Sequence, residues 1–130
     1  NLLDSNMDLI FSDLVIVNIT QRLKLINEYM ETKQEKDVFK KQNTILLVGR
    51  YDRYSKYNKK NIARYIGEKD VCTVPYSTLF FEAANEGNVA DFFLRFRKID
   101  ETDRNALFIK EIKEASGKIL YKLQELHLKM

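Results

Sequence analysis

The chain has few of the residues from which disulfide frameworks and metal clusters are built. Its 130 residues include one cysteine, Cys72, and one histidine, His127. A single cysteine forms no disulfide within the chain, and together with one histidine it cannot supply the ligands of a Cys/His metal site. The composition therefore excludes both classes and predicts a reducing, cytosolic environment.

Long apolar runs and phosphate-binding glycine patterns are missing as well. The longest apolar runs, such as Leu14–Val17 and Ile45–Val48, are far shorter than the roughly 18 residues of a membrane span, so we expect no integral membrane segment. The four glycines cannot form G-x-x-x-x-G-K-[ST] or G-x-G-x-x-G. Because no nucleophile–base pair or metal-ligand spacing is visible either, we predict no catalytic residues and no ATP hydrolysis by this chain alone.

What is present is the composition of one ordinary globular domain. Hydrophobic residues make up 45% and charged residues 32%, a balance that excludes collagen-like and wholly disordered chains. The net charge of +3 is too small for affinity to come mainly from wrapping nucleic acid. Residues 1–130 are thus expected to form a single unit with one core.

Apolar patterning predicts an α/β fold. Short β-branched runs at 14–17, 44–48 and 71–74 are typical of strands buried on both faces, and helical periodicity lies between them. Further helices are expected from Leu2 to Phe11, after Pro75, from Val89, and over a long C-terminal stretch from about Asn105. Strands joined by crossover helices indicate a parallel sheet of about three strands, with flanking helices on its two faces and the first strand left as an apolar edge.

The residues that follow the strands are the first candidate site. Segments 18–22, 49–52 and 75–77 should converge at the carboxyl edge of the sheet, where open α/β folds bind ligands. The alternative is that they are ordinary polar loops.

A basic, tyrosine-rich stretch at residues 50–65 is the second candidate. Lysine and arginine neutralise phosphates and tyrosine rings stack on bases, so the stretch fits a stand-alone module that binds nucleic acid or an acidic protein partner. The alternative is a solvated loop and helix face. The cations assigned to this role are Arg53, Lys56, Lys59, Lys60 and Arg64.

Three segments read in order resemble a known family. "DLVIVNITQ", "NTILLVGRYD" and "VCTVPYSTLFFEAANEGNVADFF" resemble the second half of the ParA/MinD family of deviant P-loop ATPases, including its TadZ/CpaE-like members. The third segment is the most specific, with a "VPxD"-like turn at 74–77 and an "A-x-x-x-G" helix ending at 83–87. The similarity covers about Asp13 to Phe93.

The resemblance implies the base-side half of a nucleotide-dependent positioning, partitioning or pilus-assembly factor. It implies that, in an intact parent protein, the loops after the last strands hold the adenine and ribose of ATP or ADP. The phosphate-binding lysines would lie in the first half of that parent. This chain alone is expected to hold no cofactor. Gly49 stands where the family has asparagine, so base recognition falls to backbone groups or to stacking by Arg50. The residues carried over by motif are Gly49, Arg50, Tyr51, Pro75 and Tyr76.

The same resemblance sets the expected partners and location. It implies that this chain is the C-terminal part of a larger ATPase-like domain. The missing half of that domain, or another protein partner, would lie along the first strand. The resemblance also implies a homodimer. It also implies a bacterial cytoplasmic protein. Peripheral attachment at the membrane or cell pole through residues 111–130 is a further hypothesis, against the alternative that this helix packs on the sheet.

Overall fold

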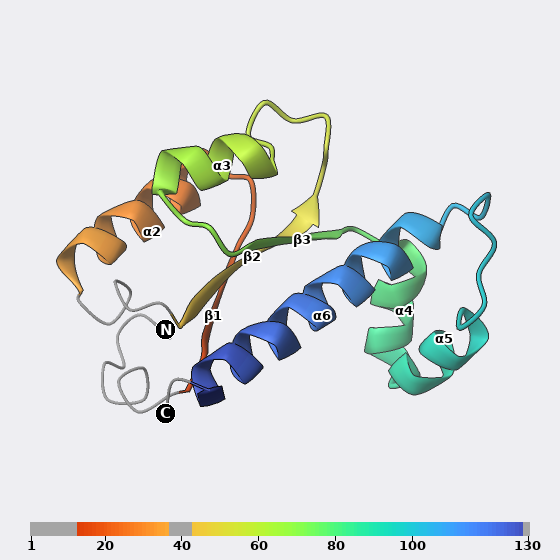
Figure 1. The fold of residues 1–130 in the computed structure, drawn as a ribbon. Helices are drawn as coiled ribbons and strands as arrows, with labels where there is room; N and C mark the ends of the chain where they lie inside the picture. Colours follow the sequence, from red (N-terminus) through yellow and green to blue (C-terminus); the bar gives the residue numbers. More distant parts are fainter. Residues whose placement is uncertain (1–12, 37–42, 129–130) are drawn as a thin grey trace.

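The computed structural model describes residues 13–36 and 43–128 of the chain (Figure 1). The helix expected from Leu2 to Phe11 lies outside these residues. In chain order the elements are β1 (Val15–Ile19), α2 (Leu23–Glu35), β2 (Thr44–Tyr51), α3 (Lys59–Ile66), β3 (Val71–Pro75), α4 (Thr78–Glu86), α5 (Val89–Arg95) and α6 (Ala106–Leu128). The α/β class, the three strands and the long C-terminal helix are as predicted.

The strands form a parallel sheet in the order β1-β2-β3. Val15 pairs with Thr44 and Ile19 with Val48, and on the other side of β2 Leu46 pairs with Val71. β1 and β3 each pair only with β2 in the described part of the chain, so the expected edge position of β1 is confirmed. Pro75 ends β3 at an edge, where its missing N–H leaves no ladder bond unmade.

The sheet is the middle of three layers (Figure 1). Ile26 and Tyr29 of α2 and Ile62 of α3 pack on one face, and Ala115 of α6 packs on the opposite face against Ile45 and Cys72. The prediction of helices on both faces is correct, but both crossover helices lie on the same face. A strand order of 1-2-3 advances in one direction, so two right-handed crossovers must share a face, and the other face is left for α6.

Beyond the carboxyl end of β3, α4 and α5 form a helical pair whose core is aromatic (Figure 1). Phe92 packs edge-on against Phe80 with ring centroids 5.5 Å apart, and against Phe108 of α6 at 5.9 Å. Ser77 caps α4 by accepting a hydrogen bond from the Phe80 N–H, 3.2 Å away. This cluster fixes the start of α6 beside the end of β3.

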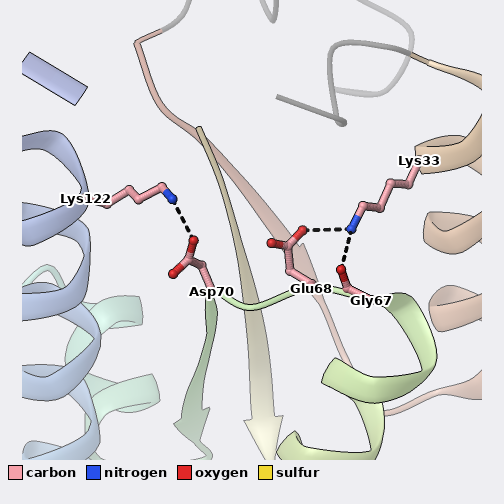
Figure 2. Close-up of polar contacts among 5 residues, drawn as sticks. All are labelled: Lys33, Gly67, Glu68, Asp70 and Lys122. Atoms are coloured by element: carbon pink, nitrogen blue, oxygen red, sulfur yellow. Dashed lines mark hydrogen bonds and ion pairs between the residues drawn. The ribbon is translucent and has the colours of Figure 1, made fainter. Parts of the chain in front are cut away.

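The loop between α3 and β3 ties the outer layers to the sheet (Figure 2). The Lys33 ammonium of α2 donates to the Gly67 carbonyl and to the Glu68 carboxylate, each at 3.2 Å. Two residues later, the Asp70 carboxylate accepts from Lys122 of α6 at 2.7 Å. Consecutive parts of one short loop therefore hold helices that lie on opposite faces of the sheet.

Candidate functional site

The three strand ends converge as the sequence predicts. The Gln21 side-chain amide, just after β1, donates to the Asp52 carbonyl at 2.9 Å and to the Tyr57 carbonyl at 3.0 Å, and its oxygen accepts from the Asp52 N–H at 2.8 Å. Gln21 thus fixes the loop that follows β2. On the other side of β2, the Arg50 guanidinium lies over the Tyr76 ring, 5.9 Å from its centroid.

Arg50 is placed there by an irregularity in β2. Val48 pairs with Thr73 and Tyr51 with Pro75, so three steps along β2 oppose two along β3. Arg50 has a φ of 51°, which makes it the one non-glycine residue with positive φ in the described part of the chain. Bulges re-aim side chains at sheet ends, and this one turns the Arg50 side chain toward the loop after β3.

Gly49 is not required by this backbone. Its φ lies outside the left-handed region, and an added Cβ would meet only the Ile19 carbonyl at 3.9 Å, an ordinary contact. The strain sits instead on Arg50, the neighbouring residue. A side chain at position 49, such as the asparagine of the resembling family, would therefore fit the fold.

A cavity of about 430 Å³ adjoins the end of β3. We call it the strand-end cavity. Of the five residues carried over by motif, Pro75 and Tyr76 line it, whereas Gly49, Arg50 and Tyr51 do not. Its other lining residues are Ser77, Thr78, Leu79, Glu82, Arg104, Asn105, Leu107 and Phe108.

Arg104 in this lining was missed by sequence reasoning. It lies in the turns between α5 and α6, where no periodicity or motif marks it. Only the packing of α6 against the α4–α5 pair brings it to the end of β3. Its guanidinium and the Glu82 carboxylate give the cavity one charge of each sign.

The basic stretch is divided by the fold. Arg53, Lys59 and Lys60 line a second cavity of about 460 Å³ beside α3 and β3. Of the remaining two cations, Lys56 lies over the Tyr57 ring, 5.2 Å from its centroid, and Arg64 is exposed on α3; neither lines this cavity. Three of the five predicted cations therefore line one depression, and the other two do not line it.

Other groups singled out by type show no site. Cys72 is buried, as expected for a small core residue, and burial raises the pKa of its thiol. Within residues 13–36 and 43–128, no cluster of three or more His, Cys, Asp or Glu is arranged to hold a metal ion. The same residues include no helix that is long and apolar enough to cross a membrane.

Comparisons with protein-family models, with curated proteins and with solved structures found no match to this chain.

Proposed function

We propose that this chain is the base-side half of a ParA/MinD-like nucleotide-dependent positioning factor. The observation that carries the proposal is the pairing of Arg50 with Tyr76 at the carboxyl edge of a parallel sheet. These are two of the five positions carried over by motif. Arg50 lies in β2 and Tyr76 in the loop that follows β3, and the bulge in β2 brings them together.

The chemistry of this pair suits a purine. A guanidinium plane and a phenol ring both stack on flat aromatic groups, and Tyr76 is 54% exposed, so its ring is available to a ligand. The strand-end cavity, which Tyr76 and Pro75 line, has the volume of a small-molecule pocket. Backbone groups of the bulge supply polar contacts in place of the missing asparagine.

The remaining parts of the proposal follow from the sheet. β1 is an edge strand with Ile16 and Val17 half-buried, and a first half of the parent domain would pair with it. That half would supply the phosphate-binding lysine. Dimerisation around nucleotide and a cargo belong to the same proposal, and the isolated chain should not turn over ATP.

The first test uses adenosine, which has a base and ribose but no phosphate. Titration into the ¹⁵N-labelled chain should shift the amide signals of Arg50 and Tyr76 at millimolar ligand. Tyr76→Ala should abolish the shifts, whereas Tyr54→Ala, at a ring that is 82% exposed on the neighbouring loop, should leave them. Unchanged signals, or equal loss in both variants, would reject the base site.

The second test addresses the parent rather than the site. The reading frame upstream of Asn1 should encode a glycine-rich loop with a lysine, roughly a hundred residues or more before this segment. A start codon immediately before Asn1 would reject the half-domain proposal and leave a self-contained module.

A further inference from the structure

The cavity beside α3 is lined by four cations, and its lining, drawn from the described residues, includes no carboxylate. We call it the cationic pocket. Lys69 adds a fourth cation to Arg53, Lys59 and Lys60, although it lies outside the basic stretch of the sequence. The other lining residues are Tyr51, Asn58, Ala63 and Val71.

None of the four cations forms an ion pair within residues 13–36 and 43–128. The ion pairs found there join Lys33 to Glu68 and Lys122 to Asp70. Arg53 donates to the Tyr54 hydroxyl at 2.9 Å, which leaves its charge uncompensated. The pocket therefore concentrates positive charge that the fold does not neutralise.

The two residues that flank Lys69 in the sequence are bonded to other elements (Figure 2). Glu68 before it is bonded to Lys33, and Asp70 after it is bonded to Lys122. The Asp70 carbonyl also accepts from the Leu46 N–H at 2.9 Å, which fixes the backbone to β2. Both flanking carboxylates are thus engaged elsewhere, and Lys69, which lines the pocket, extends from a backbone whose neighbours are fixed on both sides.

The start of α3 is fixed on the other side of the pocket. The Tyr51 hydroxyl accepts from the Lys59 N–H at 2.8 Å, and the Asn58 side chain caps the helix by accepting from the Asn61 N–H at 3.0 Å. The first turn contains no acidic residue, so Lys59 and Lys60 add their charge to the positive end of the helix dipole. The charges of Lys59 and Arg53 act on the Glu111 carboxylate of α6, but Glu111 is not among the residues that line the pocket.

From this arrangement we propose that the cationic pocket binds a compact, multiply charged phosphate anion, such as a chain of two or three phosphates. Four cationic residues line one open depression, which suits a short polyanion with several charges. A nucleic-acid strand would instead require a continuous basic track, and Lys56 and Arg64 do not continue the pocket. Neither Arg50 nor Tyr76, the pair that forms the proposed base site, lines this pocket, whereas Tyr51, another of the positions carried over by motif, does.

The test is isothermal titration calorimetry of the full chain with inorganic tripolyphosphate at about 0.1 M salt. The double variant Lys59→Gln/Lys69→Gln should weaken binding by about tenfold or more, because both substitutions remove a charge that would hydrogen-bond the anion. The matched control is Lys56→Gln/Arg64→Gln, which removes the same charge outside the pocket and should change affinity less than about threefold.

Three outcomes would overturn the proposal. The wild-type chain could fail to bind tripolyphosphate, or both double variants could lose affinity for it equally. The chain could also bind a single-stranded oligothymidylate more tightly than tripolyphosphate, with both double variants weakening that binding to the same extent. The single variant Lys69→Gln, followed by circular dichroism, keeps the test valid if the double variant unfolds. Because adenosine has no phosphate and tripolyphosphate has no base, failure of this site and failure of the base site are separately visible.

Discussion

At the residue scale, Glu111 is the carboxylate whose burial has a measurable consequence. It lies on α6 facing Thr73 of β3, and its Oε2 atom is buried with no hydrogen-bond partner in the described part of the chain. Burial, together with the nearby charge of Glu114, raises the pKa of Glu111, and the Thr73 hydroxyl and the charges of Lys59 and Arg53 only partly offset this. The folded protein therefore favours the protonated form of this side chain.

The direction of that shift predicts a pH dependence for Glu111→Gln. A pKa that is higher in the folded than in the unfolded state contributes stability that is complete below the unfolded value, about 4.3, and is lost as pH rises through the folded value. Glutamine imitates the protonated form, so the variant should be more stable than wild type at pH 7 by less than about 1 kcal/mol, since solvent screens a half-buried group. Urea unfolding between pH 3.5 and 7.5 measures the difference.

The matched control is Glu114→Gln, because Glu114 is exposed and acts on Glu111 only through its charge. It should give a smaller gain. A wild-type advantage over Glu111→Gln at pH 7 would contradict the prediction and show that the ionised carboxylate stabilises the fold.

At the element scale, the bulge in β2 concentrates backbone strain at the proposed base site. A non-glycine residue in the left-handed region costs roughly 1 kcal/mol, and such strain gathers at functional sites. Arg50 carries it although Gly49, which would carry it at no steric cost, is the preceding residue. The strained conformation places the guanidinium over Tyr76. We therefore expect Arg50 to contribute to ligand binding and not to the stability of the fold.

This predicts a difference between two substitutions that both remove the guanidinium. Arg50→Gly relieves the strain but adds chain entropy to the unfolded state, so its free energy of unfolding should stay within about 0.5 kcal/mol of wild type. Arg50→Ala keeps the strain and loses the contact with the Tyr76 ring, and should be less stable than Arg50→Gly by about 0.5–1 kcal/mol. Thermal unfolding of both variants measures the gap, and an alanine variant as stable as the glycine variant would show that position 50 is not strained.

The element boundaries show what local pattern can and cannot predict. Gly67 and Gly87 end α3 and α4 with φ values of 74° and 75°, and a glycine at the end of a helical pattern is a local signal for such a left-handed cap. β1 and β2 extend beyond their predicted ends, to Ile19 and Tyr51. Asn18, Ile19 and Tyr51 are extended because a neighbouring strand pairs with them, and Gly49 and Arg50 form the irregularity between Val48 and Tyr51.

At the scale of the whole molecule, the loop between α3 and β3 couples the three layers. Lys33 reaches it from α2 and Lys122 reaches it from α6 (Figure 2). In the second pair the side chains are 13% and 26% exposed, so solvent screens the interaction less than at an open surface. The pair links α6 to the start of β3 across 52 positions of sequence.

We therefore expect Asp70→Asn to lower the free energy of unfolding by about 1 kcal/mol, with much of the effect retained in high salt. A double-mutant cycle with Lys122→Gln isolates the energy of the pair. Chemical denaturation provides the free energies of unfolding of the four proteins in the cycle, once at low salt and once at high salt. The same cycle on Lys33 and Glu68 is the comparison. A coupling energy near zero for Asp70 and Lys122 would show that α6 is held by its apolar face alone.

The sequence by itself determined the class of this protein, its three parallel strands, its long last helix and the convergence of the strand ends at one edge, whereas the bulge in β2 decided that Arg50 lies over Tyr76. The features that the sequence determined follow from periodicity and chain connectivity, which are local and are written in residue order. Tertiary structure alone decided that both crossover helices share one face, that Arg104 reaches the strand-end cavity, and that Lys69 joins the cationic pocket while Lys56 and Arg64 do not. Cavities form where elements distant in sequence pack together, so their lining depends on the direction in which the sheet grows and on where α6 lies.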